Sequence, residues 1–197
     1  MTTTVIGVLA LQGSVIEHVG LLNKLPDVKS IEVKTLRDLE AVDGIILPGG
    51  ESTTIGKLLK DFSLLEPLKA RIQNGMPVWG TCAGLILLAK NIVGESSHLG
   101  VMDITVRRNA YGRQLDSFSS LETVPAVSES PIPLVFIRAP WIESVGRNIR
   151  TLLSINEHIV AAQEGNMLAT SFHPELTDDV TFHEYFADLC KEYKKGV

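Results

Sequence analysis

Short apolar runs alternate with amphipathic stretches along the first half of the chain. Residues 5–11 (VIGVLAL) and 44–47 (GIIL) are almost continuously apolar, as expected for strands that are buried on both faces. Residues 29–35 (KSIEVKT) alternate in polarity, and residues 77–79 (PVW) form one more short run, so each predicts another strand. Apolar residues at helical spacing predict helices over residues 14–25, 52–65, 68–74 and 85–92.

This order of strands and helices implies parallel strands that are joined by helical crossovers. We therefore predict an α/β fold with one domain over residues 1–197, a three-layer sandwich whose mostly parallel central sheet is flanked by helices. Runs at residues 102–108 and 133–139 predict a small antiparallel or mixed extension. The chain then returns to strands and ends in a helix, predicted over residues 151–155, 158–163, 167–172 and 178–193.

Composition narrows the possible partners and compartments. The 197 residues include 18 Lys and Arg against 23 Asp and Glu, and this net charge of −5 argues against a nucleic-acid partner. A hydrophobic content of 45% suits a buried core rather than a disordered chain. No signal peptide or membrane-length apolar run is present, so we expect a soluble cytoplasmic protein without a membrane partner. Its two cysteines, Cys82 and Cys190, should be reduced.

The strongest chemical signal is the segment Gly80-Thr81-Cys82-Ala83-Gly84, between a predicted strand and a predicted helix. It matches the nucleophile elbow G-x-S-x-G with Cys in place of Ser. Small neighbours let the chain reverse sharply, and the helix N-terminus favours a thiolate at Cys82. The backbone N–H of Ala83 could stabilise an oxyanion. The alternative is a small buried hydrophobic cysteine, which is how we interpret Cys190 in the terminal helix.

A cysteine nucleophile needs a base and a group that orients the base. His173 follows an apolar strand, so it should reach the same sheet edge as Cys82, and Glu175 can accept a hydrogen bond from its imidazole. The alternative is a surface His-Pro turn with a solvated carboxylate. We interpret the remaining histidines as non-catalytic, namely His18, His98, His158 and His183.

A glycine-rich loop, residues 47–54 (LPGGESTT), follows the third strand and precedes a helix. Its backbone N–H groups could bind a carboxylate or an oxyanion. A phosphate-binding loop is the competing interpretation, but the G-x-x-x-x-G-K-[ST] pattern is not met because Leu58 follows Lys57.

Together these motifs resemble a known family. PGGEST, GTCAG and HPE look like the class I, triad-type glutamine amidotransferases. The segments LALQG, LPGGESTT, GTCAGLILLAK, RRNAYGRQLDSF, VFIRAP and SFHPELTDD more specifically resemble the glutaminase subunits of pyridoxal 5′-phosphate synthase, over nearly the whole chain. The stretch from residue 121 to residue 133 is the least similar to that family.

The resemblance implies hydrolysis of L-glutamine to L-glutamate and ammonia through a glutamyl thioester. In this scheme Cys82 is the nucleophile, His173 the base and Glu175 its orienting group. The glutamine site is then formed by Gly50, Glu51, Ser52, Arg108, Ile137 and Arg138, and the oxyanion hole by Gly49, Gly50, Ala83 and Gln12. A guanidinium suits an α-carboxylate because it binds in a planar fork, although Arg108 could instead be a surface cation beside Arg107.

The resemblance also implies a partner that consumes the ammonia: a (β/α)8 synthase subunit that makes pyridoxal 5′-phosphate, the active form of vitamin B6, within a large hetero-oligomer. Such glutaminases stay nearly idle until they dock, because docking sets the oxyanion-binding peptides near Gly49 and Gly50. We expect no metal and no cofactor.

Two other function classes stay open on the sequence. One is a DJ-1-like cysteine hydrolase or deglycase, which carries an elbow cysteine but lacks the terminal His-x-Glu pair. The other is a redox-sensing module in which Cys82 is only oxidised, and such a module needs no remote His-Glu pair.

Overall fold

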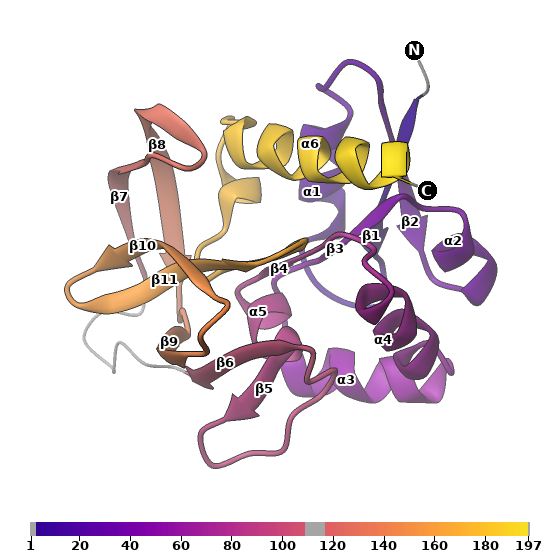
Figure 1. Cartoon of the computed structure of the whole chain (residues 1–197), viewed down its shortest axis with the longest axis horizontal. Helices are drawn as coiled ribbons and strands as arrows, with labels where there is room; N and C mark the ends of the chain where they lie inside the picture. The colour runs from indigo at the N-terminus through magenta and orange to yellow at the C-terminus, as the bar shows by residue number, and fades with distance from the viewer. Residues whose placement is uncertain (1–2, 109–116, 197) are drawn as a thin grey trace.

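The computed structural model describes residues 3–108 and 117–196, and Figure 1 shows how its elements are arranged. The helices are α1 (Val15–Leu22), α2 (Leu36–Glu40), α3 (Ser52–Asp61), α4 (Leu65–Gln73), α5 (Ala83–Leu88), the 3₁₀ turn η1 (Pro174–Leu176) and α6 (Thr181–Gly196). The strands are β1 (Thr4–Leu9), β2 (Val28–Val33), β3 (Gly44–Leu47), β4 (Val78–Thr81), β5 (Ala89–Ile92), β6 (Met102–Arg107), β7 (Ser117–Val124), β8 (Ser128–Ile137), β9 (Trp141–Val145), β10 (Arg150–Ile155), β11 (His158–Glu164) and β12 (Met167–Thr170).

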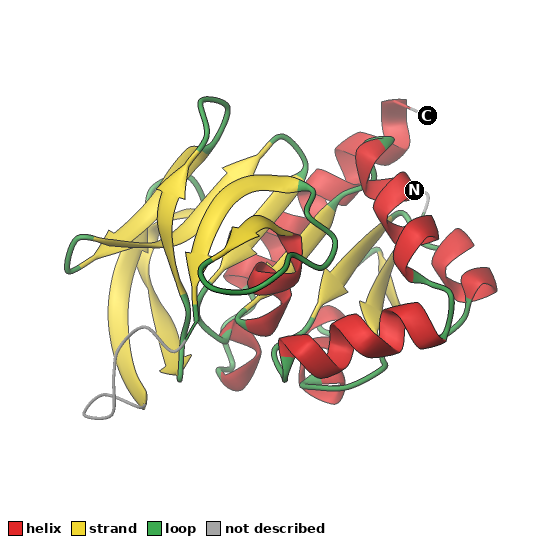
Figure 2. Ribbon diagram, turned by 90° about the horizontal axis from the view of Figure 1, so that it is seen from below, coloured by secondary structure: helices red, strands yellow, loops and turns green. Residues whose placement is uncertain are grey.

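Within the described residues the central sheet has the order β2-β1-β3-β4-β12-β11-β9-β6-β5, with β10 paired to β11. Strands β2, β1, β3, β4 and β12 are parallel neighbours, so their carboxyl ends meet at one edge of the sheet. Strand β11 runs antiparallel to β12 and to β9, and β9 runs antiparallel to β6, so the sheet continues in antiparallel pairs. The predicted α/β class with a mostly parallel sheet is therefore confirmed. Figure 2 shows the helices at the parallel half of the molecule and the antiparallel strands at the other end.

Successive residues of the central strands point to opposite faces, and each face has its own core. Ile45 and Leu47 pack with Ile55 on the side of α3, α4 and α5. Ile46 and Trp79 pack on the opposite side, against α1 and α6 (Figure 1). This two-sided burial explains why these strands are apolar at every position rather than at alternate ones.

Two predicted helices are shorter than their apolar patterns suggested. The helix predicted over residues 85–92 is α5, which ends at Leu88; residues 89–92 instead form β5, parallel to β6. Lys90 and Asn91 are exposed there while Ala89 and Ile92 are buried, so pairing with β6 outweighs the helical apolar run. The helix predicted over residues 52–65 breaks at Ser63, whose positive φ of 56° ends α3 before α4 begins.

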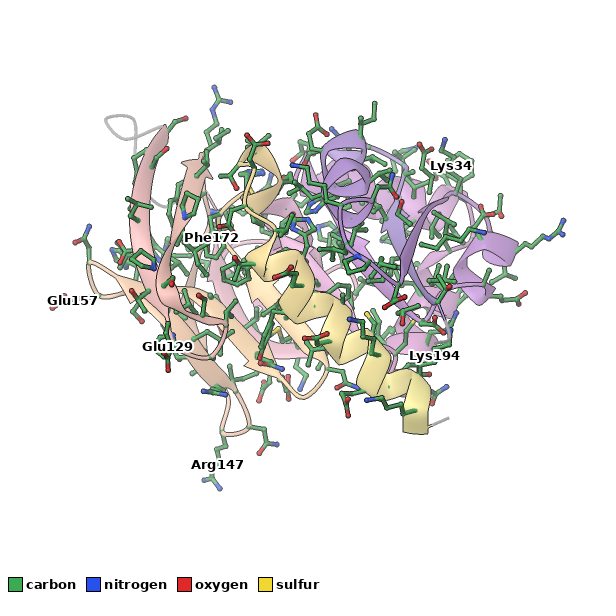
Figure 3. All side chains as sticks on the ribbon, turned by 90° about the horizontal axis from the view of Figure 1, so that it is seen from above. Lys34, Glu129, Arg147, Glu157, Phe172 and Lys194 are labelled. Atoms are coloured by element: carbon green, nitrogen blue, oxygen red, sulfur yellow. The ribbon has the colours of Figure 1, made fainter. Side chains whose placement is uncertain are left out.

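The middle of the chain forms the predicted antiparallel extension. Strands β7 and β8 form a separate two-stranded antiparallel sheet, of which only the second strand was predicted. Phe172, labelled in Figure 3, joins this sheet to the main body. Its ring packs edge-on against Phe136 of β8, at 5.6 Å between centroids, and against Phe182 of α6, at 5.1 Å. Most of the predicted segment RRNAYGRQLDSF, residues 109–116, lies outside the described residues.

No helix in the described ranges, 3–108 and 117–196, has the length and apolar character needed to cross a membrane.

We expect Gly84→Ala to destabilise the fold, because an added Cβ would lie 2.0 Å from the carbonyl oxygen of Leu47, on the neighbouring strand β3. Overpacking against backbone should lower the free energy of unfolding by about 1–3 kcal/mol. The matched control is Gly20→Ala in α1, where an added Cβ meets nothing within 4 Å and should add about 0.5–1 kcal/mol of stability. Urea unfolding measures both, and equal stabilities would contradict the packing at Gly84.

Candidate active site

Cys82 lies at the tip of the turn between β4 and α5, in a conformation that only a constrained chain keeps. Its φ and ψ are 48° and −99°, outside the regions that L-residues usually occupy. The backbone N–H of Cys82 donates to the carbonyl of Thr170 at the end of β12, which fixes the turn on the sheet. An added Cβ on Gly80 would lie 2.4 Å from the backbone of Gly84, so the small residues of the motif are required by close backbone packing.

The same sheet edge carries His173 and Glu175. Thr81 and Thr170 are register partners in β4 and β12, so the chain leaves both strands side by side. His173 follows β12 and is anchored by its own N–H, which donates to the carbonyl of Val135 in β8. Its side chain lines the same cavity as Cys82, and its Nδ1 lies 2.7 Å from Oε1 of Glu175 in η1. The structure thus brings together the three residues that the sequence singled out as nucleophile, base and orienting group.

Burial and hydrogen bonding together shift the pKa values of His173 and Glu175 in opposite directions. Burial lowers the pKa of His173, but Cys82 and Glu175 outweigh it and raise that pKa to about 10. Burial raises the pKa of Glu175, but His18, His173 and Ser14 outweigh it and lower that pKa to about 2. At neutral pH the pair is an imidazolium held by a carboxylate, which is a suitable arrangement for giving and taking a proton at Cys82.

A cavity of about 420 Å³ opens over Cys82. All six residues predicted to bind substrate line it, together with Cys82, Ala83 and His173: Gly50, Glu51, Ser52, Arg108, Ile137 and Arg138. The carbonyl oxygen of Ile137 lies 4.0 Å from Sγ of Cys82, close to where a substrate would react. Ser52 is 1% exposed, and its hydroxyl has no hydrogen-bond partner among the described residues.

Arg108 is held firmly at the wall of this cavity. Its guanidinium donates to carboxylate oxygens of Glu51, at 2.7 Å, and Glu95, at 2.8 Å, and to the hydroxyl of Thr53 at 3.1 Å. It is therefore not the loose surface cation that the sequence left open. Arg107 does not line the cavity and instead pairs with Glu143 of the adjacent strand β9.

The glycine loop and Gln12 form a second wall. Oε1 of Gln12 accepts a hydrogen bond from the N–H of Glu51 at 2.8 Å and lies against Gly50. The carbonyl of Gly49 accepts a hydrogen bond from the N–H of Ser14 at 3.0 Å. Because the peptide is planar and trans, the N–H of Gly50 points away from Ser14. The predicted oxyanion residues Gln12, Gly49, Gly50 and Ala83 therefore all adjoin Cys82 or the loop that faces it.

The sequence missed two residues that contact Glu175. Ser14 donates its hydroxyl to Oε1 at 2.7 Å, and Nε2 of His18 lies 3.5 Å from Oε2. Both belong to the start of α1, more than 150 positions earlier in the chain. A serine at a helix N-terminus usually indicates a cap, so local sequence gives no hint of this contact.

Cys190 does not line the cavity. It is 0% exposed, and burial raises the pKa of its thiol well above the usual value. No group of three or more His, Cys, Asp or Glu in the part of the chain described by the structure is placed to hold a metal ion.

Comparison with known proteins shows the family to which this chain belongs. The model of the SNO glutamine amidotransferase family matches residues 8–192. The chain belongs to this family. Three of its relatives bear the name pyridoxal 5′-phosphate synthase subunit PdxT. That of Ruminiclostridium cellulolyticum is 56% identical and that of Clostridium botulinum 58%, each over 93% of this chain and over 98% and 95% of theirs. A third, from Streptococcus pneumoniae, is 54% identical over 95% of this chain and 98% of its own.

Solved structures agree with this placement. A crystal structure described as a glutamine amidotransferase matches 94% of this chain and 98% of its own, with a TM-score of 0.89 and 42% identity. A second glutamine amidotransferase, from Thermotoga maritima, matches 98% of this chain and 86% of its own, with a TM-score of 0.61 and 17% identity, and shows the shared fold alone.

The low pKa of Glu175 predicts a specific acid sensitivity. Because its folded pKa of about 2 lies below the reference value of 4.5, the carboxylate adds stability above pH 4.5 and loses it as the pH falls toward 2. We expect Glu175→Gln to cost about 3 kcal/mol at pH 7 and progressively less below pH 4.5, as measured by urea unfolding. Glu129→Gln, on exposed β8, controls for loss of a surface carboxylate. A Glu175→Gln deficit that does not depend on pH would contradict the assignment.

Proposed function

We propose that this protein is the glutaminase subunit of a pyridoxal 5′-phosphate synthase, with Cys82, His173 and Glu175 as its catalytic triad. The observation that carries the proposal is the strained elbow cysteine, which lines one cavity together with an imidazole that Glu175 holds at 2.7 Å. Membership of a glutamine amidotransferase family and the names of its relatives support the same reaction. This joint arrangement favours the glutaminase over a DJ-1-like hydrolase or a redox sensor, neither of which needs the His-Glu pair.

The reaction proceeds in two halves. The Cys82 thiolate attacks the side-chain carboxamide carbon of glutamine and forms a tetrahedral oxyanion. His173 gives its proton to the departing nitrogen, the C–N bond breaks, and ammonia leaves a γ-glutamyl thioester. His173 then takes a proton from water, whose oxygen attacks the thioester carbon. The C–S bond breaks, glutamate leaves, and the cysteine returns to its starting state. Glu175 stabilises the imidazolium and fixes its tautomer in both halves.

The cavity walls suit a small zwitterion. Glu51 and Arg108 pair with each other at the cavity wall beside Ser52, and the ammonium and carboxylate of the substrate would take over part of this pairing. We assign the glutamine site to these residues with Gly50, Ile137 and Arg138. We assign the oxyanion hole to the backbone N–H groups of Gly50 and Ala83, with Gly49 and Gln12 as the supporting loop residues.

Partner docking should control the oxyanion hole. The peptide between Gly49 and Gly50 is tied to Ser14 through its carbonyl, so a change in that contact would reorient the N–H of Gly50. A synthase subunit that binds at this edge could supply the change. The product also supports the existence of a partner, because free ammonia would be diluted in water unless a partner used it at once. We therefore propose a (β/α)8 synthase partner within a large hetero-oligomer in the cytoplasm.

We expect Cys82→Ala to lower glutamine hydrolysis by about 1,000-fold or more, because loss of a triad nucleophile removes the covalent route. The assay is glutamate release in the presence of the synthase subunit. The matched control is Cys190→Ala, which removes the other thiol and should leave the rate within about twofold of wild type, since that side chain lies in the core away from the cavity.

Covalent trapping can identify whether Cys82 or Cys190 is the nucleophile. An electrophilic glutamine analogue should modify one cysteine, and peptide mapping should find the label on Cys82. A label on Cys190, or normal turnover by the Cys82→Ala protein, would overturn the mechanism.

Docking-gated activity gives a second expectation. The isolated subunit should turn over glutamine slowly, and addition of the synthase subunit should raise kcat by about 100-fold or more, the order of change expected when one oxyanion donor is supplied. Titration of the rate against the synthase concentration measures this. Equal rates with and without the partner would contradict gating through the Gly49–Gly50 peptide.

A further inference from the structure

A buried chain of polar side chains continues behind the triad, on the side away from the cavity. It begins at Glu175 and runs through His18 of α1 to His183 of α6, and the side chains of all three residues are almost fully shielded from solvent. The cavity that takes the substrate is lined by neither histidine. Two buried imidazoles in contact with a catalytic carboxylate need a physical reason, since burial of unpaired polar groups is costly.

The two oxygens of Glu175 have very different surroundings. Oε1 accepts from His173 and from Ser14, both at 2.7 Å. Oε2 has no hydrogen-bond partner among the described residues, and Nε2 of His18 lies 3.5 Å from it. The same Nε2 lies 3.3 Å from the hydroxyl oxygen of Thr81. A proton on Nε2 of His18 would therefore face both Thr81 and the otherwise unpaired carboxylate oxygen.

The second histidine decides where that proton sits. Nδ1 of His18 lies 2.9 Å from Nε2 of His183, so one of these nitrogens must donate and the other accept. If His18 carried its proton on Nδ1, its bare Nε2 would face a carboxylate, which is repulsive. If His183 donates instead, Nδ1 of His18 accepts and its proton stays on Nε2, toward Glu175. The electrostatics of the carboxylate thus select one tautomer for both rings.

Burial favours the neutral form of both rings, and packing holds them in place. Burial lowers the pKa of His18 more than Glu175 raises it, and burial also lowers the pKa of His183. The other titratable groups that act on His18 are His173, which lowers its pKa, and Glu17, which raises it. Trp79 packs edge-on against both imidazoles, with centroid distances of 5.7 Å and 5.0 Å, and so limits their rotation.

We propose that His18 is a positioning residue for catalysis, which holds Glu175 through a proton on Nε2 that His183 keeps there. The proposal rests on the proposed triad, because its effect reaches the substrate through Glu175 and His173. His18 keeps the carboxylate ionised and turned so that Oε1 meets Nδ1 of His173. The Cys82–His173–Glu175 triad is in this view the front part of a five-residue chain that ends in the core beneath α6.

The test uses variants of His18 in the whole protein, assayed with the synthase subunit. We expect His18→Leu to lower kcat by about tenfold or more, because the buried carboxylate loses the polar group that faces its Oε2, while KM for glutamine stays within about twofold. His18→Gln can place an amide N–H where Nε2 was, so it should recover most of the lost rate. His158→Gln, at the half-exposed start of β11 and outside the cavity lining, is the control and should leave kcat and KM unchanged.

The decisive readout is the titration of His173, which does not require turnover. In wild-type protein the NMR signal of its Cε1–H should titrate near pH 10. In His18→Leu we expect that pKa to fall by about one unit, because a less ordered carboxylate stabilises the imidazolium less well. His183→Leu removes the ring that fixes the tautomer of His18, so it should also lower the pKa of His173, but by a smaller amount. It serves as the test if His18→Leu does not fold.

The outcomes separate the two proposals. Unchanged kcat and an unchanged His173 titration in folded His18→Leu, or in folded His183→Leu where His18→Leu does not fold, would overturn the role of His18 even while Cys82→Ala is inactive. A parallel fall in kcat for His18→Leu and His18→Gln, with no shift of the His173 titration, would point to a packing role only and would also overturn it. Full activity of Cys82→Ala would instead overturn the triad itself.

Discussion

The site depends on one strained residue. Cys82 has a φ of 48°, which costs of order 1–3 kcal/mol for a side chain of this kind, and the surrounding structure must hold it there. It does so from three directions: the N–H of Cys82 is bonded to β12, Gly80 is packed against Gly84, and Gly84 is packed against the backbone of β3. The central strands are buried on both faces, so the turn cannot relax without disturbing both cores. The reactive sulfur is thereby fixed at the mouth of the cavity.

Strand order then determines what the sulfur meets. The chain makes its excursion through the antiparallel half and returns as β12, directly beside β4 and parallel to it. The residues that follow the two strands must therefore emerge at the same edge, although Cys82 and His173 are 91 positions apart. Phe172 locks the returning segment by packing between β8 and α6, and the N–H of His173 is bonded to β8. The antiparallel extension thus serves the site by holding His173 in place.

The shared edge of the parallel strands also explains which parts of the fold and of the site could be predicted from the sequence. Buried parallel strands, the elbow and the His-x-Glu segment are local patterns, and the rule that parallel strands share an edge brings them together. The β5 strand could not be separated from a helix, because residues 85–92 form one apolar run until β6 pairs with its end. Ser14, His18 and His183 gave no signal, because their contacts with one another and with Glu175 join residues 157 to 165 positions apart. A histidine within an amphipathic helix has no local pattern that indicates a buried partner.

Electrostatics explains which residue types contact the carboxylate of Glu175. Within the described part of the chain its contacts are Ser14, His18 and His173, and none of these carries a permanent charge. A lysine or arginine in the place of His18 would also keep the carboxylate ionised, but it would compensate the negative charge and weaken its hold on the imidazolium of His173. A neutral imidazole donates a hydrogen without adding a charge, so His173 remains the cation that Glu175 stabilises. The low pKa of both buried histidines is what makes this arrangement work at neutral pH.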